Sequence, residues 1–412
     1  MLQKIFSSEL ARGSTILFIM INFYNFLNYL FHFLTARLLG PADYGTLAVL
    51  MSIVYIFSIP TEAVQTVVSR YTSLLNVERD FGKMHFILSK IMLRGLKIAL
   101  IGFIFFSLFA VLLSHFLRIN YLLFFVAGIV LFGVILLPAV RGVIQGRKKF
   151  QWLGLNMIIE SFSKVGIALL FISFGWKVYG ALGGVLLGIF FSFVLSFLSI
   201  REITSAKKTE MRTEGIYVYS FSIFIVMLVV ILMYSLDIVF AKLFFTDEVA
   251  GQYAVASMIS KMIFFGTYPI GKAMFPLSAE QSDSGKKTRP LFRRSFILIL
   301  VLCFIPLAVM WFYPGLLITL LFGEAYLEVA GILFYLGLAL TLLSLTHLVL
   351  LYGIAVNRLR GYFLLFLFVG LEFFLFAFFH GTLRQFSMAF LIVNALLFFC
   401  SFFFIKRSHT QV

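Results

Sequence analysis

The sequence predicts an all-α polytopic membrane protein of about twelve transmembrane helices in two pseudo-symmetric six-helix lobes. Three features predict it: an apolar composition, apolar segments long enough to span a bilayer, and basic residues gathered in alternate loops. Of the 412 residues, 62% are hydrophobic and 12% charged, whereas soluble domains are roughly 45–50% apolar and about 25% charged. No water-soluble core can bury so large an apolar fraction, so the bilayer is the expected solvent.

Twelve segments approach the roughly 20 mostly apolar residues that a spanning helix needs. They are 14–36, 44–69, 95–117, 120–140, 151–173, 178–200, 217–242, 250–277, 295–320, 327–352, 359–379 and 384–405. The first segment has no small-residue cleavage motif at its end, which favours a retained helix over a signal peptide. The predicted lobes are residues 1–205 and 206–412.

Lys and Arg residues are concentrated in one of two alternating sets of loops. Of the 33 in the chain, 25 fall in the set that includes the N-terminus and 5 in the other set. Basic loops mark the cytoplasmic side, so both termini are predicted to be cytoplasmic, in a cytoplasmic membrane. This asymmetry explains the net charge of +16, because the basic loops face anionic lipid headgroups. Membrane lipids are therefore the expected partners, and no nucleic-acid partner is expected.

The ends of the first and seventh predicted helices resemble each other at a spacing of 205 residues. The matching pairs are Tyr29 and Tyr234, Ala36 and Ala241, Arg37 and Lys242, and Leu38 and Leu243. Gly45 and Gly251 follow at nearly the same spacing. Six helices per half would give both halves the same orientation, a plan found in transporters that bind substrate between their halves.

Polar side chains of the first helix lie on one face. Asn22, Asn25, Tyr29 and His32 fall within a stripe of about 80° when each residue advances about 100°. Such a face is unsuited to lipid. It either hydrogen-bonds to other helices or lines a hydrated cavity.

Ionisable residues occur at membrane depth, where each costs roughly 2.5–3.5 kcal/mol and requires a partner, water or a function. They include Glu62, Glu160, Asp237, Lys261 and Lys272. Asp237 is expected either to pair with a cation of the eighth helix or to act in a cavity. Glu160 is expected either to pair with Lys164, four residues on, or to act as a cavity acid. The isolated His347 and Glu372 are predicted to be packing groups.

The sixth helix contains Gly180, Gly184 and Gly188, a repeated pattern of small residues. Small residues at this spacing let helix backbones approach closely. The pattern therefore predicts tight helix packing rather than a ligand site.

The chemistry-bearing motifs of enzymes do not occur in this sequence: there is no His-Glu-x-x-His, dinucleotide-type glycine fingerprint or paired-cysteine metal site. We therefore expect no catalytic residue, no bound metal and no cofactor. The prediction is a secondary-type transporter, not an enzyme, coupled to a proton or sodium gradient.

Five segments carry a family resemblance that covers nearly the whole chain in order. They are Ala36–Gly45, Arg141–Arg147 with Phe150 and Glu160, Asp237 with Gly251–Ala254, Leu321–Tyr326, and Tyr179–Ala181. Together they resemble the polysaccharide transporter family, the oligosaccharide or O-antigen flippases of the MATE-like multidrug/oligosaccharidyl-lipid/polysaccharide exporter superfamily.

The resemblance implies a V-shaped pair of six-helix lobes with a hydrophilic cavity lined by helices 1, 2, 7 and 8. It also implies translocation of a polyprenyl-diphosphate-linked oligosaccharide, a polysaccharide precursor, across the membrane by alternating access. Other polysaccharide-assembly proteins are candidate partners, and the oligomeric state stays open.

Residue chemistry assigns roles within such a cavity. The cations expected to bind diphosphate are Arg37, Lys261 and Lys272. The groups expected to hydrogen-bond sugar hydroxyls are Asn22, Asn25 and Tyr29. The candidates for ion coupling or cavity acid–base chemistry are His32, Glu62, Asp237 and Glu160.

Three other readings stay open. A cation-coupled multidrug exporter would have an acidic cavity with few cations, which Lys261 and Lys272 disfavour. A membrane-embedded polysaccharide polymerase or ligase would need a large outer loop with catalytic residues, whereas all predicted outer loops are short. A scaffold without transport activity would not require buried charges.

Overall fold

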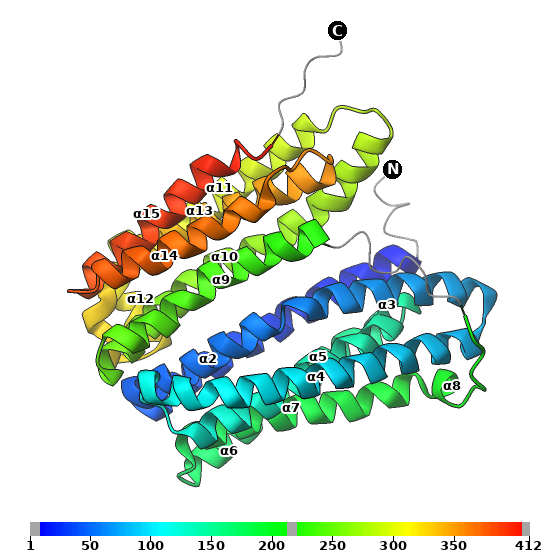
Figure 1. Ribbon diagram of the computed structural model, residues 1–412, viewed down its shortest axis with the longest axis horizontal. Coiled ribbons are helices and arrows are strands. Elements are labelled where there is room, and N and C mark those ends of the chain that lie inside the picture. The colour runs from blue at the N-terminus through cyan, green and yellow to red at the C-terminus, as the bar shows by residue number, and fades with distance from the viewer. Residues whose placement is uncertain (1–8, 212–220, 406–412) are drawn as a thin grey trace. The chain divides into compact units, whose positions relative to one another are not determined.

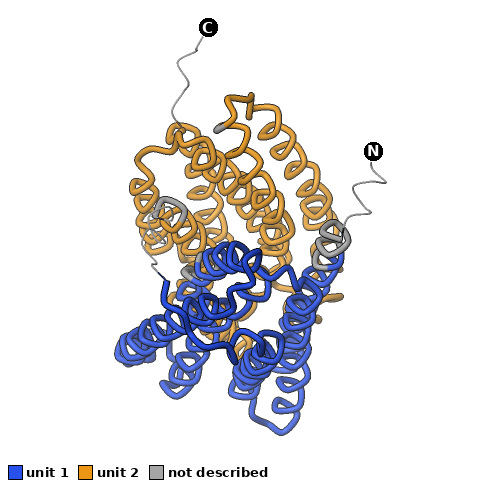
Figure 2. The backbone as a smooth tube through the Cα atoms, turned by 90° about the vertical axis from the view of Figure 1, so that its right-hand side faces the viewer, with its two compact units in different colours: residues 1–39, 53–218 blue, residues 40–52, 219–412 orange. Residues whose placement is uncertain are grey.

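The computed structural model of the protein describes residues 9–211 and 221–405, and within these ranges it consists of helices and connecting turns. The chain forms two compact units, shown in Figure 2. The N-terminal unit comprises residues 1–39 and 53–218, and the C-terminal unit comprises 40–52 and 219–412. Residues 40–52, which follow the first predicted helix (14–36), thus belong to the C-terminal unit. The predicted lobes, 1–205 and 206–412, stay a prediction.

The first half of the chain forms long helices joined by tight turns (Figure 1). They are α2 (Glu9–Phe57), α3 (Ile59–Glu78), α4 (Phe81–Leu117), α5 (Tyr121–Gly146), α6 (Phe150–Ser173), α7 (Lys177–Ser199) and the single turn α8 (Arg201–Thr204).

Helix α2 contains both the first predicted helix and the start of the second. Its backbone is broken at Gly40, where φ is 74° and ψ is 174°, directly before Pro41. Glycine adopts this conformation without the clash that a Cβ would cause, and proline cannot donate a hydrogen bond back across the break. The predicted second helix, 44–69, is also interrupted, because Ser58 caps a new helix with Pro60 in its first turn.

The stretch 70–94, which lies between the second and third predicted helices, completes α3 and begins α4. Arg79 ends α3 in the left-handed conformation, with φ of 53°. Asp80 then caps α4 by accepting a hydrogen bond from the Lys83 backbone N–H at 2.9 Å. The third predicted helix therefore begins at Phe81 rather than at residue 95.

The second half of the chain contains further helices of uneven length. They are α9 (Phe221–Phe244), α10 (Asp247–Asp283), α11 (Arg289–Phe312), α12 (Pro314–Leu321), the 3-10 turn η2 (Glu324–Ile332), α13 (Leu333–Ala355), η3 (Tyr362–Leu365), α14 (Phe366–Phe378) and α15 (Leu383–Ser401). Pro314 divides the predicted helix 295–320 into α11 and α12, because its ring and missing N–H stop an α-helix.

Within the described chain, nine helices are long and apolar enough to cross a membrane. One of them is α2, which the break at Gly40 divides in two. Helix α10 has 37 residues but carries charges at depth, and η3 with α14 forms a shorter apolar segment, Tyr362–Phe378. With the parts of α2 counted separately and α10 and α14 included, the predicted twelve helices are recovered.

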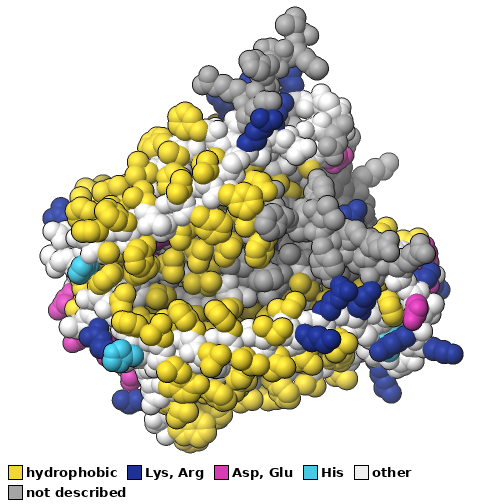
Figure 3. Space-filling model, in the orientation of Figure 1, with side chains coloured by type: hydrophobic (Ala, Val, Ile, Leu, Met, Phe, Trp, Pro, Cys, Tyr) yellow, Lys and Arg dark blue, Asp and Glu magenta, His cyan; other side chains and the backbone are white. Residues whose placement is uncertain are grey.

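Apolar side chains dominate the surface over the middle of the helices, and many charged side chains lie towards the helix ends (Figure 3). Exposed residues such as Phe105, Leu108 and Phe304 are 63%, 70% and 72% accessible. Helix α13 is buried along most of its length and forms the centre of the C-terminal unit, where it packs against α10, α11 and α15. This apolar exterior is the surface expected of a multi-pass membrane protein.

The predicted glycine packing is confirmed between α6 and α7. A Cβ at Gly184 would lie 2.6 Å from the Ala168 Cβ, and one at Gly188 would lie 2.7 Å from the Glu160 carbonyl oxygen. Only glycine permits this approach. It also brings α7 against the part of α6 that carries Glu160.

Candidate functional site

Among the described residues, each unit contains a cluster of buried charged side chains, and the C-terminal unit also buries Lys242, which pairs with Asp247 at 3.0 Å. The N-terminal cluster lies between α5, α6 and α7, and the C-terminal cluster lies between α9 and α10. Each is described by itself below.

The N-terminal cluster is built around Arg141 of α5. Its Nη2 lies 2.5 Å from Oε2 of Glu160 and donates to Ser192 Oγ at 3.1 Å, while its Nε donates to Asn156 Oδ1 at 2.8 Å. Asn156 in turn donates to the Ser192 carbonyl oxygen at 2.7 Å. The guanidinium is therefore held in one orientation by partners on two neighbouring helices.

The expected loop position of Arg141 is wrong. The predicted helix stopped at residue 140, but α5 continues to Gly146, which leaves Arg141 only 8% exposed. The missed signal is the pair Asn156 and Glu160, which are four residues apart on one face of α6 and suit a buried guanidinium.

Lys164 is also buried, at 5% exposure. Glu160 pairs with Arg141 instead of with Lys164, whose Nζ donates to Asn28 Oδ1 and lies 4.7 Å from the Phe31 ring centroid. Asn28 also donates to Ser161 Oγ at 3.0 Å. Two cations and one carboxylate thus give this unit a buried site with an excess of positive charge.

The C-terminal cluster is centred on Asp237 of α9, which is fully buried. Its Oδ1 lies 3.2 Å from Nζ of Lys261, and its Oδ2 accepts hydrogen bonds from Ser257 at 2.5 Å and Tyr253 at 3.4 Å. All three partners come from α10. Of the two alternatives for Asp237, the structure contains the pairing with a cation of the eighth predicted helix.

Glu372 of α14 adds a second carboxylate to the surroundings of this pair. It is fully buried, both of its carboxylate oxygens are without a hydrogen-bond partner among the described residues, and it lies within electrostatic range of Asp237 and Lys261. Sequence reasoning set Glu372 aside as an isolated packing group, because nothing in the spacing connects α14 with α9. Two carboxyl groups and one ammonium thus share one buried site, a set of groups able to exchange a proton or to hold a small cation.

The remaining predicted residues of α2 lie in the N-terminal unit. Asn22 and Arg37 are exposed, Asn25 and Tyr29 are partly buried, and His32 is 4% exposed with its ring against Phe31. The Tyr29 hydroxyl is buried without a hydrogen-bond partner in the described part of the chain. The roles proposed for these residues stay predictions.

Lys272 and Glu62 are the remaining residues predicted for the site. Lys272 of α10 is exposed and lies 4.7 Å from the Tyr268 ring centroid, whereas Lys261 on the same helix is buried. Glu62 lies in α3, and its side chain is outside the described residues. Among described side chains, no three His, Cys, Asp or Glu residues gather closely enough to hold a metal ion.

Comparison with known proteins identifies a family and a fold. A model of the family described as "Polysaccharide biosynthesis protein" matches residues 10–282, about two thirds of the chain. None of the curated protein sequences matches this chain.

Solved transporter structures share the fold. An inward-facing MATE multidrug resistance transporter of the MOP superfamily aligns with a TM-score of 0.77 at 14% identity, over 92% of each chain. A MATE transporter in complex with MaL6 aligns with a TM-score of 0.66 at 14% identity, over 97% of this chain and 96% of that one.

A further structure with this fold is a MOP superfamily transporter from Pyrococcus furiosus Vc1, for which a binding pocket of reverse polarity suggests a different function. It aligns with a TM-score of 0.59 at 14% identity, over 96% of this chain and 94% of that one. The all-helical fold, the apolar exterior and the family match agree, and this multi-pass membrane protein belongs to the polysaccharide biosynthesis protein family, with the fold of MOP superfamily transporters.

Proposed function

We propose that this protein is a flippase that moves a polyprenyl-diphosphate-linked oligosaccharide across the cytoplasmic membrane by alternating access. The observation that carries the proposal is the family match over residues 10–282 in a chain with a transporter fold. The role is that of a secondary transporter rather than an enzyme, with both termini in the cytoplasm as the loop charges predict.

The C-terminal cluster supports a coupling role. Asp237 and Lys261 neutralise each other, so Lys261 is less suited to a phosphate than the sequence suggested. With Glu372 close by, protonation or cation binding would change the charge of the buried site by one unit and alter the stability of the α9–α10 contact. We therefore propose that Asp237, Lys261 and Glu372 couple transport to a proton or sodium gradient.

The exposed cations suit the substrate better. Lys272 and Arg37 are accessible and able to bind the oxygens of a diphosphate, each within its own unit. Asn22 and Asn25, on the polar face of α2, offer amide groups to sugars. The Tyr29 hydroxyl is buried and would reach a sugar only in another conformation of the transport cycle. His32 and Glu160 are further candidates for cavity acid–base chemistry, as is Glu62.

The test is to delete the gene in its host and measure the leaflet distribution of lipid-linked oligosaccharides by leaflet-specific labelling. Deletion should cause accumulation in the cytoplasmic leaflet, and the wild-type gene should restore export. Lys272→Ala should reproduce the defect in part, whereas Lys287→Ala, which removes an exposed cation from a loop, should restore export fully. A normal leaflet distribution in the deletion strain would refute the flippase proposal.

A cation-coupled multidrug exporter is the second candidate. The observation that favours it is the excess of buried carboxylate in the C-terminal cluster, in a chain whose fold is also that of multidrug transporters. A deletion strain with altered drug resistance and unaltered lipid-linked oligosaccharides would select this candidate.

A further inference from the structure

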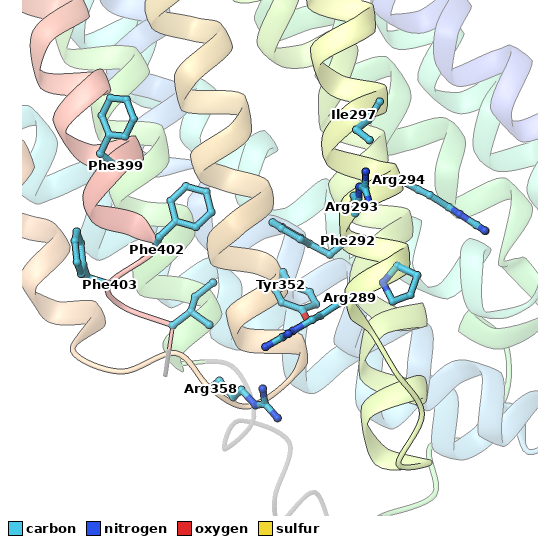
Figure 4. A pocket seen from close by; sticks show the side chains of 12 residues that line it. Arg289, Phe292, Arg293, Arg294, Ile297, Tyr352, Arg358, Phe399, Phe402 and Phe403 are labelled. Carbon is cyan, nitrogen blue, oxygen red and sulfur yellow. The ribbon is translucent and has the colours of Figure 1, made fainter. Parts of the chain in front are cut away.

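A basic pocket of about 1520 Å³ lies at one end of the C-terminal unit, outside both buried clusters. Its walls come from α11, α13, α15 and the turns that follow α13 and α15 (Figure 4). Four arginines line it, namely Arg289, Arg293 and Arg294 of α11 and Arg358 of the turn after α13. All four lie between predicted helices, in segments that the charge asymmetry assigns to the cytoplasmic side.

The wall around Arg289 is fixed by packing between α11 and α13. The Tyr352 hydroxyl and Thr288 Oγ1 are hydrogen-bonded at 2.8 Å, and the rings of Phe292 and Tyr352 pack at an angle of 32° with centroids 4.5 Å apart. Arg289 follows Thr288 directly and is the first residue of α11. Its side chain is therefore held next to Tyr352, as Figure 4 shows.

The position of Arg358 is fixed by a different set of backbone contacts. Its N–H donates to the Gly353 carbonyl at 2.8 Å, and the next residue, Leu359, forms a bridge with Ile405. The Arg360 N–H then donates to the Phe404 carbonyl at 3.0 Å. These bonds tie the turn to the end of α15. In Figure 4 the side chains of Arg289 and Arg358 approach each other below Tyr352, while Arg294 extends away.

The pocket combines uncompensated positive charge with exposed aromatic surface. Within residues 9–211 and 221–405, none of its four arginines forms an ion pair with an acidic side chain. Phe399, Phe402 and Phe403 on the same rim are 64%, 43% and 87% exposed. A guanidinium group donates two parallel hydrogen bonds to the oxygens of a phosphate. Exposed phenylalanines at a membrane boundary provide an apolar surface for acyl chains.

We propose that this pocket binds the headgroup of an anionic phospholipid that carries two phosphates, with its acyl chains along Phe399, Phe402 and Phe403. Two phosphates match a site with several arginines better than one phosphate does. The volume exceeds the roughly 300–1,000 Å³ of small-molecule pockets, and the phenylalanine rim offers nothing to a free inorganic anion. The lipid site is separate from the proposed transport cargo and does not depend on it.

The experiment is native mass spectrometry of the purified full-length protein with cardiolipin, phosphatidylglycerol, phosphatidylethanolamine or inorganic pyrophosphate. Arg289→Gln with Arg358→Gln removes the two converging guanidiniums. Lys287→Gln with Arg360→Gln is the matched control, since it removes two exposed cations from the same two loops outside the pocket. Phe403→Gln tests the apolar rim.

Cardiolipin should bind most tightly, and the pocket double variant should weaken it on the order of tenfold or more, with less than about twofold change in the control. Phe403→Gln should weaken cardiolipin but leave pyrophosphate unchanged. An equal loss of cardiolipin affinity in both double variants would show that binding depends on general surface charge, and would overturn the proposal. Displacement of cardiolipin by equimolar pyrophosphate would assign the pocket to free phosphate instead, and preferred binding of phosphatidylethanolamine would refute an anionic site.

Discussion

Asp237 and Lys261 show how a buried ion pair differs from two separate charges. Both side chains are almost fully buried, and their attraction offsets the cost of removing each from water. Removing one partner leaves the other buried and uncompensated, whereas removing both also removes the desolvation cost. The pair is therefore expected to contribute more to the specificity of the α9–α10 contact than to net stability.

This difference is testable by a double-mutant cycle. Lys261→Met and Asp237→Asn should each destabilise the protein by about 3–5 kcal/mol, and the double variant should be close to wild type in stability. Thermal unfolding in detergent measures the effect. Lys272→Met, on the same helix but exposed, is the control and should change stability little. Additive losses in the double variant would show that the two charges do not act as a pair.

The pair Arg147 and Glu202 gives a pH dependence outside the membrane-spanning segments. Arg147 Nη2 lies 2.7 Å from Glu202 Oε2, and this hydrogen bond with the guanidinium charge lowers the pKa of Glu202. A lowered folded-state pKa stabilises the protein above the unfolded-state pKa of about 4.3, and this contribution disappears as the pH falls through the folded-state value.

Accordingly, Glu202→Gln should lower the free energy of unfolding slightly at pH 7, by no more than about 1 kcal/mol, because the carboxylate is largely exposed. The difference from wild type should narrow below about pH 4 and vanish once Glu202 is protonated. Unfolding midpoints of both proteins from pH 3 to 7 measure this. A difference that grew as the pH fell would contradict the assigned sign.

The sequence allowed side-chain contacts to be predicted where the residues lie on one helix or on consecutive helices. Asp237 and its cation lie on consecutive helices, so hydropathy and charge sufficed to name the pair as one of two alternatives. Glu372 joins them from α14, and Arg141 meets Ser192 across two helices, which requires knowledge of the packing. The distinction is one of sequence separation, because period and spacing describe a single helix and not its neighbours.

At the scale of elements, the repeated glycines Gly45 and Gly251 mark a helix crossing in the C-terminal unit. A Cβ at Gly45 would lie 2.7 Å from the Gly251 Cα, and one at Gly251 would clash with the Pro41 carbonyl oxygen. The equivalent glycines of the two sequence repeats thus meet each other. Packing therefore explains why glycine occurs at both positions, since a side chain on either residue would prevent the two helices from making contact.

Substitution at this crossing should be costly. Gly251→Val should destabilise the protein by about 1–3 kcal/mol, because the added atoms meet backbone that cannot move independently. Gly266→Val in the same helix α10 is the control, since a Cβ there would meet nothing within 4 Å. Unfolding temperatures of the two variants provide the comparison. If both lost the same stability, helix propensity rather than the crossing would be the cause.

Helix ends were the least predictable elements, for a physical reason. Hydropathy identifies the part of a helix that crosses the bilayer, but α4 begins 14 residues earlier and α3 continues to Glu78 in polar sequence. Those ends are set by a cap at Asp80 and a left-handed residue at Arg79. Short breaks at Ser58 and Pro314 were likewise hidden inside apolar runs whose hydropathy is continuous.

At the scale of the whole molecule, composition and loop charge were sufficient for the fold class. In lipid every backbone polar group must be satisfied within the protein, and apolar segments of about 20 residues achieve this as helices, so the all-helical architecture follows from segment length and solvent together. Orientation follows from a separate term, the preference of Lys and Arg for the cytoplasmic side. Arg141, which the predicted boundary at residue 140 leaves in a loop, lies buried in α5, yet its removal from the count leaves the asymmetry intact.

Orientation can be measured directly by labelling single cysteines. In a chain with Cys303→Ser and Cys400→Ser, Lys286→Cys lies in the exposed turn between α10 and α11, and Lys177→Cys lies at the exposed start of α7. A membrane-impermeant thiol reagent added to intact cells should label Lys177→Cys only, because the loop charges place Lys286 in the cytoplasm. Permeabilised cells, in which both should react, are the control. Labelling of Lys286→Cys in intact cells would reverse the orientation and move the arginine pocket to the outer leaflet, where its lipid partner would have to be sought instead.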